Sequence, residues 1–418
     1  MRAVAIIDGE HYASVVRDAL AELPYDFVAA VLIGGQEKLR GGEEYGVPLV
    51  ADVDTAIASH TPELVVDLSD EPVLGPVERF RLASRVLASG VPYVGADFRL
   101  DPPERLPFEL PSIAVVGTGK RVGKTAVTGH LARLLARDRR VVVVAMGRGG
   151  PREPEVIDAQ PTVETLVELS RTGRHAASDH LETAALVGVT TVGCRRCGGG
   201  LAGGVASSNV AEGARIAARL EPELVVFDGS GAALPPIAAR KTVAVVGGHQ
   251  APSLAAGYLN AYRLLLADIV VLTMATPSSA WEGVRDAVRE AVRADVPVVP
   301  SILRPRPLAD IRGRRTAYFC AAPAFAHGSL REHLSRVHGA DVVSVSGNLA
   351  HRPALREELP GIDADVFLVE LKAAAIDVVA EAALERGAEI VLAANDVTPL
   401  VGEPDLDELL LEMTTMRA

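Results

Sequence analysis

The residues with the clearest chemical potential form a glycine-rich segment that also carries two lysines and a threonine. The segment reads Gly117, Thr118, Gly119, Lys120, Arg121, Val122, Gly123, Lys124 and Thr125. An apolar run at 112–116 precedes it, and the apolar spacing at 126–135 predicts a helix after it. A strand, a glycine-rich turn and a helix opening with Gly-Lys-Thr are typical of a phosphate-binding loop, because unpaired backbone N–H groups and the helix dipole attract phosphate oxygens. In such a loop Lys124 would reach the β- and γ-phosphates of a nucleotide, and the Thr125 hydroxyl would bind Mg²⁺.

The loop departs from the usual spacing, because five residues rather than four separate Gly117 from Gly123 and Thr118 stands at the usual first-glycine position. This longer loop resembles that of dethiobiotin synthetase and of cobyrinate-type amidoligases, a P-loop class that activates substrates with ATP. The alternative is an accidental glycine-rich turn. Lysine usage favours the phosphate loop, because two of the five lysines in the chain, Lys120 and Lys124, fall inside it and a compact ammonium suits a phosphate. We therefore predict that the loop binds ATP and that both lysines act in catalysis.

A carboxylate follows another apolar run. Asp228 comes directly after 223–227 and opens a glycine-rich turn. P-loop enzymes hold Mg²⁺, or its water shell, with an acid at the end of a buried strand. We predict that Asp228 takes part in catalysis and binds the metal together with Thr125. The alternative is that Asp228 caps a turn.

Two arginine-containing segments are candidates for binding an anionic substrate. Arg148 lies in a glycine-rich loop after 141–146, a strand that we expect beside the P-loop strand. Arg195 and Arg196 follow a strand predicted at 187–192. Backbone amides and guanidinium groups together make an anion-binding loop. The glycines that would complete this loop include Gly198 and Gly199.

Two cysteines flank these arginines. Cys194 and Cys197 have the spacing of half a zinc site or of a thiol–disulfide pair. A closed zinc site needs two further ligands, and Cys320 is the only other cysteine in the sequence. A redox pair would open a helix rather than precede a glycine-rich run. We therefore prefer the arginines as the working residues, and a surface loop with solvated arginines is a further alternative.

Weaker candidates for the substrate site come from other parts of the sequence. Asp179 and His180 form an adjacent acid–base pair, although such pairs also occur on ordinary helices. Lys372 is one of the few lysines, and it pairs either with a phosphate or with a neighbouring glutamate. Asn395 and Asp396, near the end of the last apolar run, are a hint of the same kind.

The elements around these residues alternate between strand and helix, which predicts a mostly parallel α/β architecture. We predict a Rossmann-like N-terminal domain at 1–108, a P-loop NTPase core at 111–300, and a C-terminal α/β unit at 301–418 that either stands alone or extends the same sheet. A proline-rich stretch at 99–110 is typical of a linker.

Polar residues also gather after the strands expected in the first hundred residues. Asp8 and His11 follow the first of these strands, and Asp70 follows the third. In open α/β sheets this edge is where ligands bind. Helix caps and solvated turns explain the same residues equally well.

The composition is that of a folded protein, with 418 residues of which 49% are hydrophobic and 23% charged. The formal net charge of −12 argues against non-specific nucleic-acid binding, and it demands local basic clusters if the substrate is an anion. We identify no signal peptide and no apolar stretch long enough to span a bilayer. Three cysteines suggest a reducing compartment. We therefore predict a cytoplasmic protein with no membrane or nucleic-acid partner, and we expect a homodimer.

Taken together, these segments resemble the cyclic 2,3-diphosphoglycerate synthetase family. The segments that carry the resemblance are 117–125, 146–151, 195–204 and 228–236, supported by 7–11 and 370–375. The resemblance implies an ATP-dependent ligase that closes a phosphoanhydride ring on 2,3-diphosphoglycerate and releases ADP and phosphate, with Mg²⁺ and K⁺ as cofactors. The two flanking cysteines depart from the family pattern, as does an aspartate at 228 where relatives carry glutamate. The alanine- and arginine-rich composition also suggests a host unlike the archaea in which this family is best known.

The implied chemistry suits these residues. ATP can convert one phosphate of the substrate into an anhydride, and the neighbouring phosphate then attacks and expels inorganic phosphate. Holding both groups in one site makes the second step intramolecular, which lowers its barrier by up to about 7–11 kcal/mol. Two rival functions remain open at this point: a kinase or ligase acting on another small phosphorylated or carboxylated acid, and a nucleotide-switched metallochaperone that uses the two cysteines.

Overall fold

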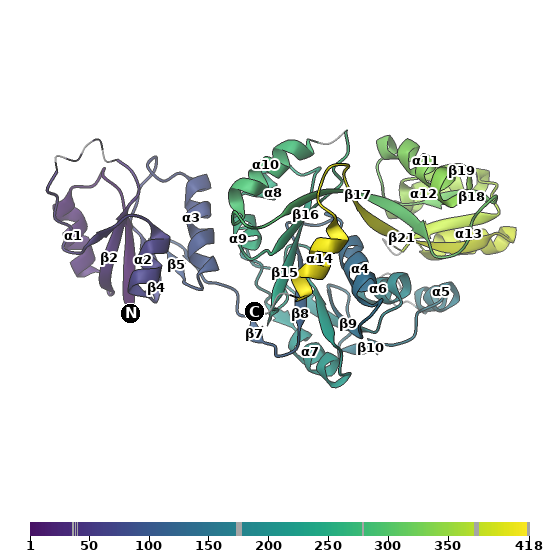
Figure 1. Ribbon diagram of the computed structural model, residues 1–418, viewed down its shortest axis with the longest axis horizontal. Coiled ribbons are helices and arrows are strands. Elements are labelled where there is room, and N and C mark those ends of the chain that lie inside the picture. Colours follow the sequence, from purple (N-terminus) through teal and green to yellow (C-terminus); the bar gives the residue numbers. More distant parts are fainter. Residues whose placement is uncertain are drawn as a thin grey trace.

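The chain forms α/β layers along one long axis, with the N-terminal sheet at one end and the C-terminal strands at the other (Figure 1). The computed structural model describes residues 1–35, 37, 39, 41–172, 178–277, 280–371 and 376–415. Lys372, a predicted substrate ligand, lies outside the described residues. Most strand pairs are parallel and are connected through helices, which confirms the predicted α/β class with a P-loop domain between two flanking units.

The N-terminal sheet has the strand order β3-β2-β1-β4-β5-β6. Its strands are β1 (Arg2–Ile7), β2 (Asp26–Leu32), β3 (Leu49–Val50), β4 (Leu64–Asp67), β5 (Tyr93–Val94) and β6 (Arg99–Leu100). Its helices are α1 (Ala13–Glu22), α2 (Val53–His60) and α3 (Pro76–Ala88). Because β2 and β4 lie on opposite sides of β1, the winding direction changes between β1 and β4. The loops that follow these two strands carry Asp8 and Asp70, which therefore face each other at this point.

The predicted linker carries two short strands. β6 pairs antiparallel with β5 and closes the N-terminal sheet. β7 (Leu106–Pro107) pairs with β14 (Ile237–Ala238) from the middle of the chain. These two pairings tie both ends of the linker to ordered structure.

The remaining strands, within the described ranges, belong to one 13-stranded sheet with the order β10-β11-β9-β13-β8-β15-β16-β17-β21-β20-β18-β19 and with β12 paired to β11. Its first part comprises β8 (Ser112–Gly117), β9 (Val141–Gly147), β10 (Glu155–Ile157), β11 (Thr191–Cys197), β12 (Ser207–Ser208), β13 (Leu224–Asp228), β15 (Lys241–Gly247), β16 (Ile269–Thr273) and β17 (Val298–Pro307). β8, β9, β13 and β16 are buried along their whole length, as their continuous apolar runs predict for parallel strands covered on both faces.

Two expectations about this sheet are wrong. β9 does not lie beside the P-loop strand β8, because β13 pairs with both of them and lies between. Strands that follow each other in sequence are neighbours only about two-thirds of the time. The strand expected at 187–192 instead runs from Thr191 to Cys197, because Val187 ends a helix that Gly188 terminates with a φ of 75°. Arg195 and Arg196 therefore lie at the end of a strand rather than in a loop.

The C-terminal unit continues the central sheet through β17. This strand passes residue 300 and pairs antiparallel with β21 from Ser301 to Pro307. The other strands of the unit are β18 (Arg315–Phe319), β19 (Asp341–Ser346), β20 (Val366–Glu370) and β21 (Glu389–Pro399). The long pair β17–β21 therefore joins the two parts without a break in the hydrogen-bonded sheet.

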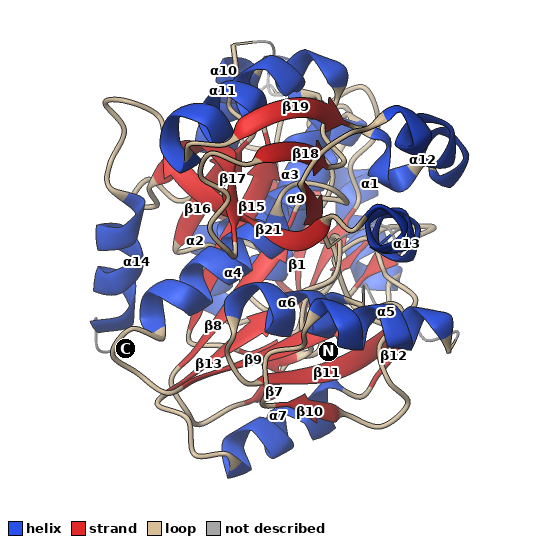
Figure 2. Cartoon of the chain, turned by 90° about the vertical axis from the view of Figure 1, so that its right-hand side faces the viewer, coloured by secondary structure: helices blue, strands red, loops and turns tan. Residues whose placement is uncertain are grey.

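Helices cover both faces of the central sheet. Those of the central part are α4 (Lys124–Leu135), α5 (Val163–Arg171), α6 (Asp179–Val187), α7 (Val210–Arg219), α8 (Pro252–Ala255), α9 (Asn260–Leu265) and α10 (Trp281–Ala291). Those that follow β17 are α11 (His327–His338), α12 (Arg352–Glu358), α13 (Ile376–Arg386) and α14 (Leu406–Thr415). Figure 2 shows α4 and α6 on one face of β8, β9 and β13, with α7 on the other. The helix α14 returns from the C-terminal unit and packs against α4, and His130 Nε2 of α4 lies 2.6 Å from Asp407 Oδ1 of α14.

Candidate nucleotide and polyanion site

The glycine-rich segment forms the turn between β8 and α4, as a phosphate-binding loop requires. Its backbone makes two sharp changes of direction, with φ values of 62° at Arg121 and 81° at Gly123. A left-handed φ costs a non-glycine residue free energy. The conformation at Arg121 must therefore be stabilised by contacts elsewhere in the loop. Lys120 and Arg121 are both exposed.

The contacts that hold the loop come from residues that the sequence did not single out. The Thr118 hydroxyl donates to Gln250 Oε1 at 2.8 Å, and the Asn260 side-chain amide donates to the Thr118 carbonyl at 3.0 Å. The Thr273 hydroxyl donates to the Val122 carbonyl at 2.7 Å. Thr273 is the last residue of β16, and Gln250 follows the end of β15 by three residues. Their position at the ends of apolar runs was the one signal in the sequence that could have identified them as loop contacts. The threonine at 118 thus adds the side-chain bond to Gln250, whereas the bond from Asn260 goes to a backbone carbonyl that a glycine would also have.

The structure brings two predicted catalytic residues into contact. The Lys124 ammonium forms an ion pair with Asp228 Oδ1, and the Thr128 hydroxyl donates to the same oxygen at 2.8 Å. Asp228 is 1% exposed. A carboxylate so deeply buried is stable in its charged form only with partners of this kind. The end of β13 and the first turns of α4 are thereby locked together.

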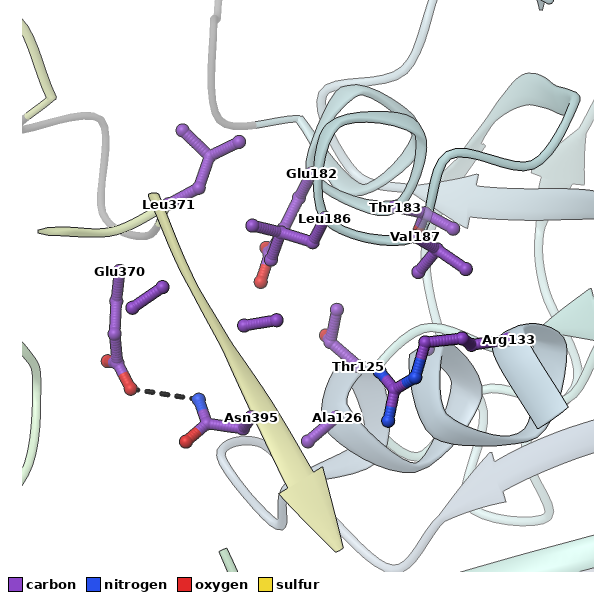
Figure 3. A pocket seen from close by; sticks show the side chains of 13 residues that line it. Thr125, Ala126, Arg133, Glu182, Thr183, Leu186, Val187, Glu370, Leu371 and Asn395 are labelled. Carbon is purple, nitrogen blue, oxygen red and sulfur yellow. Dashed lines mark hydrogen bonds between the residues drawn. The ribbon is translucent and has the colours of Figure 1, made fainter. Parts of the chain in front are cut away.

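Thr125 lines a cavity between α4, α6 and the C-terminal strands. Figure 3 shows its side chain facing Glu182 of α6 and Glu370 and Asn395 of β20 and β21. Asn395 donates to Glu370 Oε1 at 2.9 Å. The C-terminal unit therefore forms a wall of the site close to the P-loop.

An ion-paired cluster fastens this wall to the P-loop helix. Asp396 Oδ1 lies 2.6 Å from Arg133 Nη2 of α4 and 3.1 Å from Arg306 Nε of β17. Asn395 and Asp396 were only weak hints in the sequence, and the structure assigns both to this junction. This cluster therefore connects β17 and β21 directly to α4.

The predicted substrate ligands Arg148 and Arg196 meet beside the P-loop. A Cβ built on Gly231 would lie 3.0 Å from Arg148 Nη2 and 3.9 Å from Arg196 Nη2. A Cβ built on Gly117, the first residue of the loop, would lie 2.9 Å from the Gly231 carbonyl oxygen. The turn at 228–236 therefore lies between the two arginines and the P-loop. A side chain at Gly117 would collide with backbone, and Gly231 has a φ of 59°, a conformation that favours glycine.

Arg196 is held by backbone oxygens and repelled by its neighbour. It donates to the Ser230 carbonyl at 2.9 Å and to the Gly198 carbonyl at 2.8 Å, and its Nε is buried without a hydrogen-bond partner. Burial lowers the pKa of Arg196, the nearby Arg148 lowers it further, and Asp179 acts in the opposite direction. Two crowded guanidinium groups are stabilised when an anion binds between them.

The remaining candidates lie in less convergent positions. Asp179 Oδ2 would be 3.0 Å from a Cβ on Gly147, which places it beside the end of β9. His180 is 4% exposed, its ring lies against Gly193 of β11, and its Nε2 is 3.6 Å from Glu155 Oε2. Arg195 is exposed. Gly198 and Gly199 are exposed beside Arg196, and Gly198 has a φ of 71°.

The two cysteines face different environments. Cys194 is 0% exposed in the apolar cluster between β11 and α7, and burial raises the pKa of its thiol to about 12. Cys197 is exposed. In a strand, residues three apart point to opposite faces, so the two sulfurs do not converge on one metal. Among the described residues no group of three or more His, Cys, Asp and Glu side chains is arranged to hold a metal ion.

The donor set near the P-loop suits a hard cation held mostly by other ligands. Asp228 offers a buried carboxylate, and Thr125 offers a hydroxyl in the first turn of α4. Mg²⁺ is usually bound by one or two protein oxygens together with phosphates and water. These two residues therefore fit Mg²⁺, whereas they would not form a closed all-protein site. In the part of the chain that is described, no helix is both long enough and apolar enough to cross a membrane.

A parallel sheet, a glycine-rich loop that runs into α4, and a buried acid on the adjacent strand define a P-loop nucleotide-binding protein. Family models give a finer assignment. The N-terminal, P-loop and C-terminal domain models of cyclic 2,3-diphosphoglycerate synthetase match residues 2–101, 112–302 and 307–396. The chain belongs to the cyclic 2,3-diphosphoglycerate synthetase family.

Curated relatives of the same name match over nearly the whole chain. A protein from Rubrobacter xylanophilus is 52% identical over 95% of this chain and 94% of its own length. One from Thermococcus gammatolerans is 45% identical over 98% and 96%, and one from Methanothermus fervidus is 38% identical over 99% and 96%. A solved structure of a DUF1611 family protein from Anabaena variabilis covers 84% of this chain and 95% of its own, at 13% identity and a TM-score of 0.18. A likeness that slight carries no weight for the fold.

Proposed function

We propose that the protein is an ATP-dependent ligase that converts 2,3-diphosphoglycerate into cyclic 2,3-diphosphoglycerate and releases ADP and inorganic phosphate. The observation that carries the proposal is that Arg148 and Arg196 meet at Gly231, whose carbonyl oxygen lies next to Gly117, the first residue of the P-loop. A nucleotide triphosphate on the loop and a second polyanion on the arginines would lie next to each other. The names of the relatives support this choice of polyanion.

The first step is transfer of the γ-phosphoryl group to one phosphate of the substrate. Lys124 exchanges its ion pair with Asp228 for the β- and γ-phosphates, while backbone N–H groups of the loop bind the same oxygens. Lys120, which is exposed on the loop, would neutralise charge that develops on the transferred group. The product of this step is ADP and a substrate phosphoanhydride.

The second step closes the ring. The neighbouring phosphate of the substrate attacks the phosphorus of the anhydride that is linked to the glycerate oxygen, and inorganic phosphate leaves. Arg148 and Arg196 hold the two substrate phosphates in contact, which makes the attack intramolecular and lowers its barrier by up to about 7–11 kcal/mol. The guanidinium groups also offset the repulsion between neighbouring phosphates.

Thr125 and Asp228 are the residues proposed to hold Mg²⁺, which would neutralise phosphate charge when bound. We assign no residue to K⁺, and exchange of KCl for NaCl in the assay tests that requirement. A homodimer in the cytoplasm also belongs to the proposal, and light scattering on purified protein tests the oligomeric state.

Phosphorus NMR tests the function directly. Purified protein with ATP, Mg²⁺ and 2,3-diphosphoglycerate should form a cyclic diphosphate, one ADP and one inorganic phosphate for each ring closed. Turnover of a different small acid without the cyclic product would replace the proposed substrate. Stoichiometric zinc or nickel in the purified protein, with ATP hydrolysis indifferent to small acids, would favour a metallochaperone.

A further inference from the structure

Arg263 is a buried arginine that the proposed chemistry does not use. It lies on α9, on the face of the central sheet opposite α4, and is 3% exposed. Its guanidinium donates four hydrogen bonds, and every acceptor is a carbonyl or amide oxygen rather than a carboxylate. A buried charge with only neutral acceptors is costly unless it performs a task that neutral side chains cannot.

Two of these bonds reach the loops that carry the polyanion ligands. Arg263 Nε donates to the Ala232 carbonyl at 2.7 Å, and Ala232 follows Gly231, where Arg148 and Arg196 meet. Arg263 Nη2 donates to the Leu201 carbonyl at 3.1 Å, in the glycine-rich segment that follows Arg196. The same guanidinium therefore fixes both segments that surround the arginine pair.

A third connection reaches the nucleotide loop. Arg263 Nη1 donates to the side-chain oxygen of Asn260 at 3.2 Å and to the Leu259 carbonyl at 2.8 Å. Asn260 in turn donates to the Thr118 carbonyl of the P-loop at 3.0 Å. One side chain thus links the P-loop, the turn at 228–236 and the segment at 198–204, although these lie far apart in sequence.

The bonding pattern requires arginine in particular. The planar guanidinium has five donors in a fixed fork, whereas a lysine ammonium is a single point with three donors. A lysine at this position could not reach acceptors on three sides at once. Burial lowers the pKa of Arg263 to about 10, which leaves the group charged at neutral pH. Its charge also adds to the positive potential of the site.

We propose that Arg263 is a positioning residue that sets the separation between the nucleotide loop and the arginines that hold the second polyanion. Its role is to keep the accepting phosphate in line with the γ-phosphate. The inference rests on the proposed function for its kinetic consequence, while the link between the three loops stands on its hydrogen bonds. A displacement of about 1 Å between reacting groups costs about 10²-fold in rate.

The test compares Arg263→Lys with Arg293→Lys in the full chain. Arg293 is half-exposed and donates to a single carbonyl, that of Leu265, so its replacement is a matched control outside the three loops. For R263K we expect cyclic product to form about 10²-fold more slowly, with the KM for ATP changed by less than about 3-fold. The ratio of cyclic product to ADP should also fall, because transfer to water competes when the acceptor is misaligned. This ratio does not depend on the fraction of folded enzyme, so mere destabilisation leaves it unchanged.

A second measurement separates this inference from the proposed function. Amide hydrogen exchange should increase together at 117–123, 198–204 and 228–236 in R263K and remain unchanged in R293K. If wild-type protein makes no cyclic product, the proposed function fails, and the exchange pattern alone decides on Arg263. An unchanged product ratio, or faster exchange in fewer than all three segments, overturns the inference. If R263K does not fold, Asn260→Ser removes the branch from Arg263 to Thr118, together with the bond from Asn260 to the Leu254 carbonyl, and leaves the bonds of Arg263 to Ala232 and Leu201 in place. Exchange should then speed up at 117–123 and stay unchanged at 198–204 and 228–236; no change at 117–123 would overturn the link.

Discussion

The carboxyl edges of the N-terminal and central sheets have the same architecture and opposite chemistry. At the N-terminal edge Asp8 accepts hydrogen bonds from the backbone N–H groups of Glu10 at 2.9 Å and Asp70 at 2.7 Å, and its Oδ1 lies 2.8 Å from His11 Nδ1. At the central edge Arg148 and Arg196 are crowded together, and one guanidinium nitrogen of Arg196 is buried without a partner.

This difference shows that topology marks where a ligand can bind, while the state of the polar groups selects the ligand. The buried carboxylate of the first edge is satisfied within the fold, which supports a role as a structural turn. The guanidinium groups of Arg148 and Arg196, at the carboxyl edge of the central sheet, repel each other and are stabilised when a polyanion binds. A protein with a net charge of −12 can therefore still attract one at this site.

The largest expected effect comes from the central edge. Lys124→Ala should lower kcat/KM for ATP by about 10²–10³-fold, because a charge-assisted contact to the transferred phosphate is lost. Lys241→Ala is the control, since Lys241 pairs with Asp268 at the opposite end of the sheet. Steady-state assays of both variants check the result. Retention of more than a tenth of wild-type kcat/KM in K124A would remove Lys124 from the nucleotide site.

Removal of the arginine pair should separate the two substrates. The double variant Arg148→Ala, Arg196→Ala should raise the KM for the acid by about 10²-fold, because each charged hydrogen bond contributes about 1.5–3 kcal/mol. The KM for ATP should change by less than about 3-fold. Arg195→Ala, which truncates the exposed neighbour, should have a smaller effect. An equal rise in both KM values would show that the arginines support the fold rather than the acid.

At the N-terminal edge the expected effect is on stability. Asp8→Asn should lower the free energy of unfolding by about 1–3 kcal/mol and leave the KM for the acid unchanged. Chemical denaturation and kinetics check the two halves of this prediction. A raised acid KM in a folded D8N variant would make this edge part of the substrate site and break the contrast between the edges.

The pH dependence of the same variant sharpens the comparison. Burial alone would raise the pKa of Asp8, but the hydrogen bonds from Asp70 and His11 outweigh it and hold the pKa below its ordinary value of 3.8. The stabilisation is therefore present above that ordinary value and is lost as pH falls through the lower folded pKa. D8N should lack this acid-range loss. A stability–pH curve identical to that of the wild type would contradict the assignment.

The smallest expected effect is at Cys197, one of the two cysteines that flank the arginines. Cys197→Ser should change stability by less than about 0.5 kcal/mol, because the side chain is exposed. Cys194→Ser should cost about 1–3 kcal/mol by burying a hydroxyl in an apolar cluster. Activity per folded molecule should be unchanged in both. Loss of a bound metal together with activity would revive the zinc interpretation.

The P-loop was predictable from sequence because its signal is local. A buried strand, a glycine-rich turn and Gly-Lys-Thr specify one another within fifteen residues. The position of Asp228 at the end of a buried strand was predictable for the same reason, since an apolar run ends directly before it; its catalytic role stays a prediction. Arg148 and Arg196 were predicted as ligands of the same substrate, and the structure brings them close together, although Arg148 was placed by a strand neighbour that is wrong. Their substrate role remains a prediction.

What the sequence could not reveal depends on contacts between distant segments. Nothing in the residues of β8 or β9 indicates that β13 lies between them. The predicted boundary between 300 and 301 falls inside β17, which runs through Pro300, Pro305 and Pro307. In the antiparallel pair with β21, alternate residues direct their N–H groups away from the partner, and Pro305 and Pro307 occupy such positions. Arg263 is part of no sequence motif, because the three segments that it connects are far from it in sequence.

The packing of α14 against α4 has a consequence for how the protein matures. The ribosome completes the nucleotide loop and its helix early, and more than half of the chain is translated before the segment that covers α4 emerges. Leu406 and Leu410 then fill the same apolar cluster as Leu131 and Leu135. Until that happens the apolar cluster on this side of α4 lacks the leucines that complete it. Nucleotide affinity should therefore depend on the docking of 406–415 against α4 and not on synthesis of the loop alone.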